Sequence, residues 1–165
     1  MQQMELLGVR VELPSNAPIV LLREMSDSAR LLPIFIGAPE ATAIAIALDG
    51  MTTPRPMTHD LLRNVLEELS ADLERVVVTE LREKTFFAEL HLLRDGSRFV
   101  LSSRPSDAIA LAARTGTPIF AEDSVIEEAG YTAEGTAVAD QQPAEEVVEQ
   151  FREFIDSVSP EDFGA

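Results

Sequence analysis

The first part of the chain alternates between apolar and polar positions, which predicts three short strands. Between residues 4 and 13 the apolar side chains recur at every second position, the period of a half-buried strand. Residues 19–24 and 31–36 form two further apolar runs, and segments rich in Pro, Asn and Ser separate the three. Pro33 predicts an edge strand or the start of a strand, because proline has no N–H to donate to a neighbour.

The next segments change to a helical period. Residues 40–48 are rich in Ala and Ile on nearly all sides, which predicts a helix that is buried or at an interface. Residues 58–70 place their apolar side chains at the spacing of one helix face. Two more helices are expected: residues 106–114, ended by Gly116, and a short one at 124–129.

The remaining patterns predict strands between these helices. Residues 75–81, 85–93 and 98–101 are rich in β-branched and aliphatic side chains, and Asp95-Gly96 predicts a hairpin turn between the last two. A last strand is expected at 117–121.

The C-terminal part has a different composition. Residues 121–165 contain 13 acidic residues and one basic residue, whereas residues 1–120 contain 16 acidic and 12 basic ones. We therefore expect a domain at 1–130, a linker at 131–142, and an acidic C-terminal helix and tail at 143–165. The tail is either a solvated segment or an inhibitory arm that competes with an anionic ligand.

Composition narrows the function classes. The chain has no cysteine, which excludes disulfides, thiolate catalysis and Cys-ligated zinc. Its N-terminus lacks the basic and apolar stretches of a signal peptide, and no run of about 18 apolar residues predicts a membrane span. We expect a soluble, cytoplasmic protein with no membrane contact. The net charge of −16 argues against a nucleic-acid partner, although residues 1–120 contribute only −4.

Two helix starts resemble each other and supply candidate chemistry. The first is Arg55-Pro56-Met57-Thr58-His59-Asp60, and the second is Arg104-Pro105-Ser106-Asp107. Each combines an arginine, a proline, a hydroxyl suited to N-capping and an acid in the first turn. A helix N-terminus beside an arginine is a plausible phosphate site. We therefore expect the two arginines to face one common pocket.

These motifs resemble the bifunctional nuclease domain family. The similarity also includes Phe35-Ile36-Gly37, followed by Glu40-Ala41, and Thr85-Phe86-Phe87-Ala88, and it extends over about residues 4–130. The resemblance implies a single compact α+β domain, with a mixed, largely antiparallel sheet packed with several helices. It also implies a tendency to dimerise and hydrolysis of DNA and RNA. The chain has Ser102-Ser103 where the family usually has Asp-Ala, which removes one possible metal ligand.

Phosphodiester hydrolysis requires an activated water and stabilisation of charge on the phosphoryl oxygens. An imidazole exchanges protons near neutral pH, and carboxylates are the ligands that Mg²⁺ or Mn²⁺ prefer. No organic cofactor is expected. The catalytic candidates are His59, Asp60 and Asp107; the substrate-binding candidates are Arg55, Thr58, Arg104 and Ser106; the metal-ligand candidates are Asp60, Asp107 and Glu80, with Glu89 as a further carboxylate.

Each candidate also has a structural interpretation. Asp60 and Asp107 suit the first turn of a helix because of its dipole. In this interpretation Arg55 and Arg104 pair with these acids and stabilise the helix starts. Glu40 is explained as a helix-start residue, and His91 as a solvent-facing strand residue. The competing hypothesis is a non-enzymatic oligomeric module that binds a small anion, a nucleotide or a protein partner.

We also expect a homodimer. The apolar helix at 40–48 and the strand edge near Pro33 are the predicted contact surfaces, because both expose or carry apolar side chains that need a partner.

Overall fold

A bent seven-stranded sheet organises the protein, which the computed structural model describes over residues 1–13 and 15–132. The strand order is β3-β2-β1-β7-β4-β5-β6. Neighbouring strands are antiparallel except β4 and β7, so the sheet is mixed but largely antiparallel, as expected. The strands are β1 (Gln2–Glu12), β2 (Ala17–Glu24), β3 (Leu31–Phe35), β4 (Asp72–Arg82), β5 (Thr85–Arg94), β6 (Ser97–Ser103) and β7 (Ile119–Ala121).

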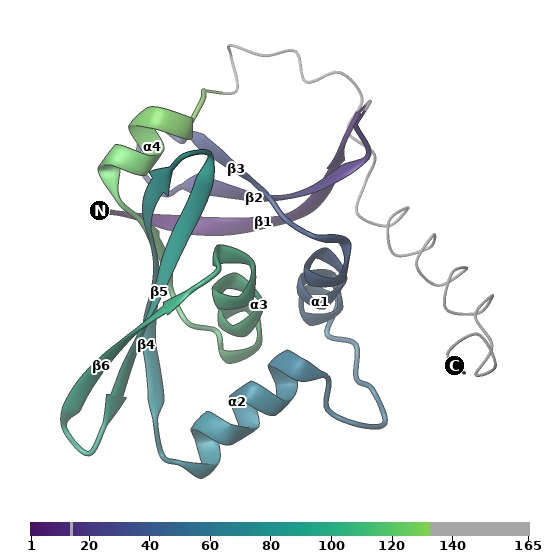
Figure 1. Cartoon of the computed structure of the whole chain (residues 1–165), viewed down its shortest axis with the longest axis vertical. Helices are drawn as coiled ribbons and strands as arrows, with labels where there is room; N and C mark the ends of the chain where they lie inside the picture. Colours follow the sequence, from purple (N-terminus) through teal and green to yellow (C-terminus); the bar gives the residue numbers. More distant parts are fainter. Residues whose placement is uncertain (14, 133–165) are drawn as a thin grey trace.

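Helices fill the inner side of the bend. The described residues form α1 (Ala38–Leu48), α2 (Thr58–Glu68), α3 (Pro105–Thr115) and α4 (Asp123–Ala129). In Figure 1 the strands β1–β3 cross the strands β4–β6 at a steep angle, α1 and α3 lie inside the corner, and α4 lies outside it. The predicted α+β class is therefore confirmed, and the strand and helix positions agree with the patterns to within a few residues.

The helix α3 is the centre of the core. Its run from Ala108 to Ala112 is buried on every side, between α1 and the strands β4 and β5. The alanines of α1 and α3 allow the two helices to pack closely, because interhelical distance depends on the side chains at the contact. This packing fixes the direction in which the first turn of α3 points.

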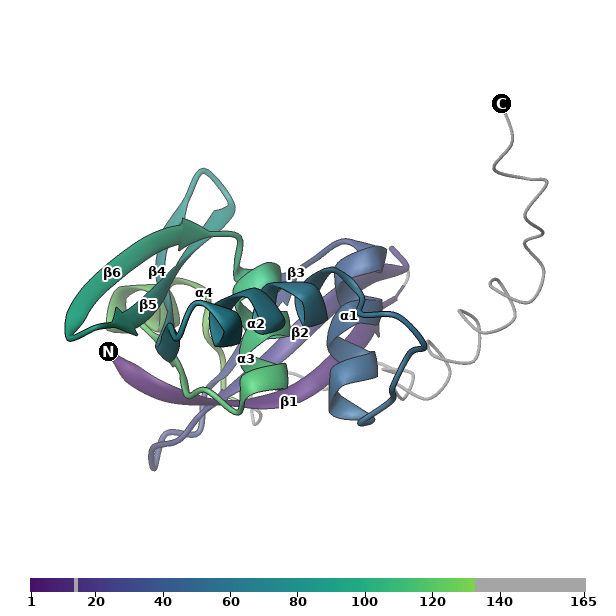
Figure 2. The ribbon, with the colours of Figure 1, turned by 90° about the horizontal axis from the view of Figure 1, so that it is seen from below.

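The helix α2 has a different environment. It lies across α3 in Figure 2, and His59 is the single buried residue among its eleven. Leu66 packs against the core, but the other apolar side chains of its periodic face are exposed. These are Leu61, Leu62, Val65 and Leu69.

The two edge strands of the sheet are β3 and β6, and the sequence predicted the first of them. Pro33 lies on β3, which is an edge strand, as predicted. The opposite edge is β6, where Phe99, Val100 and Leu101 are all exposed. Most of the predicted linker at 131–142, and the whole acidic helix at 143–165, lie outside the described residues.

Candidate phosphate-binding site

A hollow opens beside the start of α3. Its volume is about 380 Å³, and it lies between the end of β3, the β4–β5 hairpin and the first turn of α3. Arg104, Ser106 and Lys84 are its polar lining groups with the greatest capacity to bind an anion. The full lining is Ala17, Ile34, Phe35, Ile36, Gly37, Lys84, Thr85, Phe86, Arg104, Pro105 and Ser106.

Arg104 is held in place by carboxylates from two helices. Its Nε and Nη2 atoms donate to the two oxygens of Asp107 at 2.7 and 3.0 Å. Its Nη1 atom lies 2.8 Å from Glu40 Oε1, which comes from the first turn of α1. A guanidinium has five N–H groups, so these contacts leave two for a ligand. The Arg104 side chain is 65% exposed and reaches the hollow.

Ser106 supplies a second polar group. The residue is 6% exposed, it lines the hollow, and no hydrogen bond of its hydroxyl is found among the described residues. Arg114 Nη2 is the one buried side-chain nitrogen or oxygen without a partner in the described residues, so the Ser106 hydroxyl oxygen is not sealed away from the hollow. The Ser106 hydroxyl is therefore available to a ligand in the hollow.

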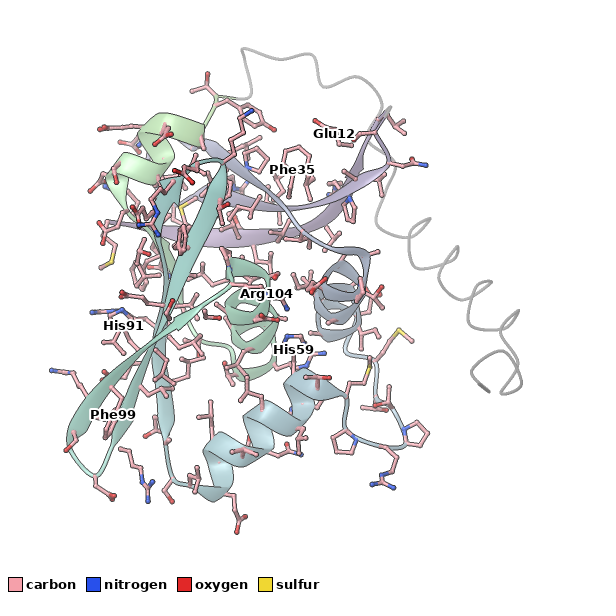
Figure 3. All side chains as sticks on the ribbon, in the orientation of Figure 1. Glu12, Phe35, His59, His91, Phe99 and Arg104 are labelled. Carbon is pink, nitrogen blue, oxygen red and sulfur yellow. The ribbon has the colours of Figure 1, made fainter. Side chains whose placement is uncertain are left out.

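His59 joins this group from α2. Its Nε2 atom lies 3.1 Å from Asp107 Oδ1, the same oxygen that accepts from Arg104 Nη2. Since an ionised carboxylate only accepts, His59 Nε2–H is the donor, and the lone pair of a neutral ring is on Nδ1. Figure 3 shows His59 and Arg104 approaching this point from α2 and from the start of α3. The contact with Asp107 fixes the orientation of the imidazole, which lies outside the lining of the hollow.

Asp60 has a separate partner. Its Oδ1 accepts from Arg114 Nε at 2.6 Å, and its Oδ2 accepts from the backbone N–H of Met57 at 3.0 Å. Arg114 belongs to the last turn of α3, and its side chain is only 3% exposed. Its Nη1 donates to the Ala110 carbonyl, and its Nη2 is buried without a partner among the described residues. This ion pair fastens the start of α2 to α3.

These contacts change the proton affinity of both aspartates. Burial opposes ionisation of Asp60, but the hydrogen bonds from Arg114 and the Met57 amide outweigh it and lower its pKa. Burial likewise opposes ionisation of Asp107, while the hydrogen bonds from Arg104 and His59 hold its pKa below the ordinary value. Both carboxylates are therefore anions at neutral pH.

The expected convergence of Arg55 and Arg104 was wrong for this hollow. Arg55 is exposed and is absent from its lining. A second hollow of about 220 Å³ beside α2 is lined by Asp60 and Arg63, together with Met51, Thr52, Thr53, Pro56 and Asn64, and Arg55 is absent there too. The two motifs meet instead through His59–Asp107 and Asp60–Arg114.

The capping roles of the hydroxyl residues were also wrong. The N-cap residues are Met57 for α2 and Arg104 for α3, so Thr58 and Ser106 lie inside the first turns. Thr58 is exposed and Ser106 is buried. Arginine is a poor N-cap, because its side chain has no acceptor for the free N–H groups. Its position is explained by its contacts with the two carboxylates.

The carboxylates in this arrangement do not fit a divalent cation. All four oxygens of Asp60 and Asp107 already accept hydrogen bonds. Glu80 is exposed on β4, where its nearest cation is Arg82 at 3.9 Å, and Glu89 contacts His91. Over residues 1–13 and 15–132, no group of three or more His, Asp or Glu side chains is arranged to hold a metal ion.

Several residues of the site carry no distinctive sequence signal. Glu40 was interpretable only as a helix-start residue, yet its side chain binds Arg104. Arg114 resembles any basic residue in a last helical turn. Lys84 and Phe35 come from a hairpin and an edge strand, and only the fold brings them to α3. The usable signals were the family motif segments that contain Phe35 and Glu40, and Lys84, which is the one lysine of the chain.

Comparison with known proteins identifies relatives over most of the chain. The chain is 44% identical to an uncharacterized protein, Rv1829 of Mycobacterium tuberculosis, over all of this chain and 99% of that protein. It is 28% identical to bifunctional nuclease 1 of Oryza sativa subsp. indica over 68% of this chain. It is 29% identical to bifunctional nuclease 2 of Arabidopsis thaliana over 65% of this chain. The match covers 34% of each plant protein.

A family model gives the assignment directly. The model of the bifunctional nuclease domain matches residues 20–134, which includes both helix starts, the hydrogen-bonded network and every residue that lines the hollow except Ala17. No helix of the described residues is long and apolar enough to cross a membrane. The chain therefore belongs to the bifunctional nuclease domain family.

Proposed function

We propose that the protein is a nuclease that hydrolyses phosphodiester bonds of DNA or RNA at the hollow beside α3. The observation that carries the proposal is Arg104, which is fixed by Asp107 and Glu40 while two of its N–H groups remain free. A fixed guanidinium stabilises the charge that develops on phosphoryl oxygens, because it needs no reorganisation during the reaction. Ser106 adds a hydroxyl donor at the same place.

His59 is the proposed acid–base group. Asp107 holds its Nε2–H and thereby leaves Nδ1 free to take a proton from the attacking water. Water oxygen then bonds to phosphorus, the phosphorus–ester oxygen bond breaks, and the leaving oxygen takes up a proton. Asp60 is assigned a positioning role, since it binds Arg114 and anchors the start of α2. The carboxylates of Asp60 and Asp107 are taken up by hydrogen bonds, and the described residues contain no cluster of three or more ligands for a metal ion.

The test compares the two histidines of the chain. His59→Gln keeps an N–H that is able to reach Asp107 but removes the base, and cleavage of single-stranded and double-stranded substrates should fall about a hundredfold or more. His91→Gln is the matched control, because His91 lies on β5 and pairs with Glu89, whereas His59 contacts Asp107, the partner of Arg104. Assays in a chelator and in Mg²⁺ or Mn²⁺ report whether a metal contributes.

The outcome against the proposal is specific. If His59→Gln, folded by circular dichroism, cuts as fast as the wild type, the activity does not come from this site. The binding hypothesis then gains support. One observation favours it: the lining of the hollow contains arginine, lysine and hydroxyl groups but no carboxylate or imidazole. A domain that binds an oligonucleotide tightly with no turnover under any of these conditions would be a binding module.

We also propose a homodimer, with α2 and β6 as its contact surface. The helix α1, the sequence-based candidate, buries Ala41, Ala43, Ile44 and Ala45 inside the domain. The apolar face of α2 and the apolar side chains of β6 are instead exposed. An edge strand pairs readily with a copy of itself about a twofold axis, and the apolar face of α2 is a second exposed surface for a partner copy to cover.

Light scattering at micromolar concentration tests the dimer. Val65→Glu should shift the protein from dimer to monomer, because a buried unpaired charge is costly at an apolar interface. Glu67→Arg on α2 is a control for surface charge. A wild-type protein that is monomeric, or a Val65→Glu variant that remains dimeric, would exclude this interface.

A further inference from the structure

An exposed phenylalanine borders the same hollow. Phe35 is the last residue of β3, it is 57% exposed, and it lines the hollow opposite α3. Figure 3 shows Phe35 on β3 and Arg104 at the start of α3. Backbone pairing with β2 holds this end of β3 in the sheet, so folding does not require the Phe35 ring to be exposed. Its exposure makes the ring available to a ligand.

The other aromatic side chains of the hollow region are engaged. Phe86 packs against the core, and the Phe87 ring is covered by Arg82 at 4.6 Å from its centroid. Among the described phenylalanines, Phe35 and Phe99 are the two in the exposed class, and Phe35 alone of these lines the hollow. The lining of the hollow therefore combines an exposed aromatic residue from β3 with the phosphate-binding groups at the start of α3.

The charge balance indicates how a ligand would be held. Arg104 is paired with two carboxylates, so the cluster of Arg104, Asp107 and Glu40 has no surplus positive charge. Lys84 is the remaining cation of the lining. Affinity for a nucleic acid at such a site depends less on phosphate charge and more on stacking of bases, which every base is able to provide.

We infer that the hollow binds single-stranded nucleic acid, with an unpaired base stacked on Phe35 and a backbone phosphate at Arg104 and Ser106. A paired base is already stacked within its duplex, and reaching the ring would require unstacking it. The inference rests on the proposed function for the class of substrate. It adds a preference for single strands and a residue that determines it.

The experiment measures binding separately from cleavage. Fluorescence anisotropy with a labelled phosphorothioate thymidine oligonucleotide, which resists hydrolysis, gives Kd for the single strand, for its duplex and for an abasic strand of equal length. Phe35→Ala should weaken binding of the thymidine strand about tenfold and leave the abasic strand unchanged. Phe35→Tyr should retain most of the affinity, because its ring still stacks.

Phe99→Ala is the matched control. Phe99 is 49% exposed on β6 and does not line the hollow. The Phe99→Ala variant should bind the thymidine strand as the wild type does. Because Phe99 is also part of the proposed dimer surface on β6, light scattering on both variants checks that the oligomeric state is unchanged. Ser106→Ala should weaken the thymidine and abasic strands alike, since both carry the phosphate.

The results distinguish the inference from the proposed nuclease activity. Equal Kd values for single strand and duplex, equal loss in Phe35→Ala and Phe99→Ala, or no binding at all would overturn the inference. Selective loss in Phe35→Ala together with no cleavage of an ordinary oligonucleotide would support the binding site while excluding hydrolysis. If Phe35→Ala leaves the cleavage rate unchanged, the proposed nuclease activity would stand, but Phe35 would not be the residue on which the base stacks.

Discussion

The helices α2 and α3 begin with similar sequences but have different roles in the structure. The first turn of α3 is fixed by the core around it, so Arg104 and Ser106 project into a defined hollow. The first turn of α2 is held mainly by polar contacts of His59 and Asp60, while Arg55 stays in solvent. A shared motif therefore does not give a shared role; the packing of the helix behind it decides.

The largest expected effect concerns the anchor of α2. Asp60→Ala removes the carboxylate partner of Arg114, whose side chain is 3% exposed. An uncompensated buried charge is strongly destabilising, so the free energy of unfolding should fall by about 3 kcal/mol. Asp107→Ala should cost less, because its partner Arg104 is largely exposed. Urea unfolding followed by circular dichroism measures both.

A double variant sharpens this result. Asp60→Ala combined with Arg114→Met removes both charges, and it should regain part of the lost stability because no buried ion is left unpaired. Equal stability of Asp60→Ala and Asp107→Ala would contradict the view that α2 is anchored by the Asp60–Arg114 pair.

The second prediction compares the two arginines. Arg104→Gln should lower the cleavage rate about a hundredfold, because it removes the fixed charge that faces the phosphoryl group. Arg55→Gln should change the rate less than about twofold, since exposed groups outside a site contribute little. Initial rates on one labelled oligonucleotide give the comparison, and a large loss in Arg55→Gln would restore the idea of two cooperating arginines.

The third prediction uses pH. The pKa of Asp60 is lowered by Arg114 and the Met57 amide despite its burial, so its contribution to stability is present above the unfolded pKa of about 3.8 and is lost as pH falls through the folded value. The stability difference between wild type and Asp60→Asn should therefore be largest at neutral pH. It should shrink below about pH 4.

Urea unfolding at a series of pH values measures that difference directly. Asp107→Asn should show the same trend with a smaller amplitude, because the guanidinium of Arg104 is in contact with solvent. A difference for Asp60→Asn that stays constant down to acid pH would show that the Asp60 carboxylate does not gain its stabilising effect from ionisation.

Sequence patterns predicted the fold better than the site. Strand alternation, the Asp95-Gly96 turn and the apolar run of α3 depend on local spacing, and each appears in the structure where it was expected. The site depends on pairs distant in the chain: Arg114 lies 54 residues from Asp60, and His59 lies 48 residues from Asp107. Local patterns do not encode which of several arginines an acid will contact.

The exposed apolar face of α2 shows a second limit of sequence patterns. Its helical period predicted an apolar face correctly, yet that face points away from the core of this chain. Periodicity identifies the side of a helix that needs cover, but it does not identify what covers it. The resemblance of residues 4–130 to the family therefore carried more information about function than the apolar period of either helix.

The smallest expected effect concerns the support of Arg104 from α1. Gly37 is the N-cap of α1 in an extended conformation that alanine adopts freely, but a Cβ there would collide with Glu40 Oε2. Glu40 has a flexible side chain and is able to move, so Gly37→Ala should leave stability nearly unchanged while weakening the Glu40–Arg104 contact. Arg104 then gains a free N–H and a less compensated charge, and oligonucleotide affinity should rise about twofold.

Glu40→Gln separates charge from position in the same assay. It keeps the length of the side chain and removes its charge, so it should raise the affinity as Gly37→Ala does and make binding more sensitive to salt. If both variants instead bind more weakly, the value of Glu40 lies in holding the guanidinium still. The first turn of α1 would then also be needed to fix Arg104 at the hollow. The comparison of the starts of α2 and α3 would extend to α1.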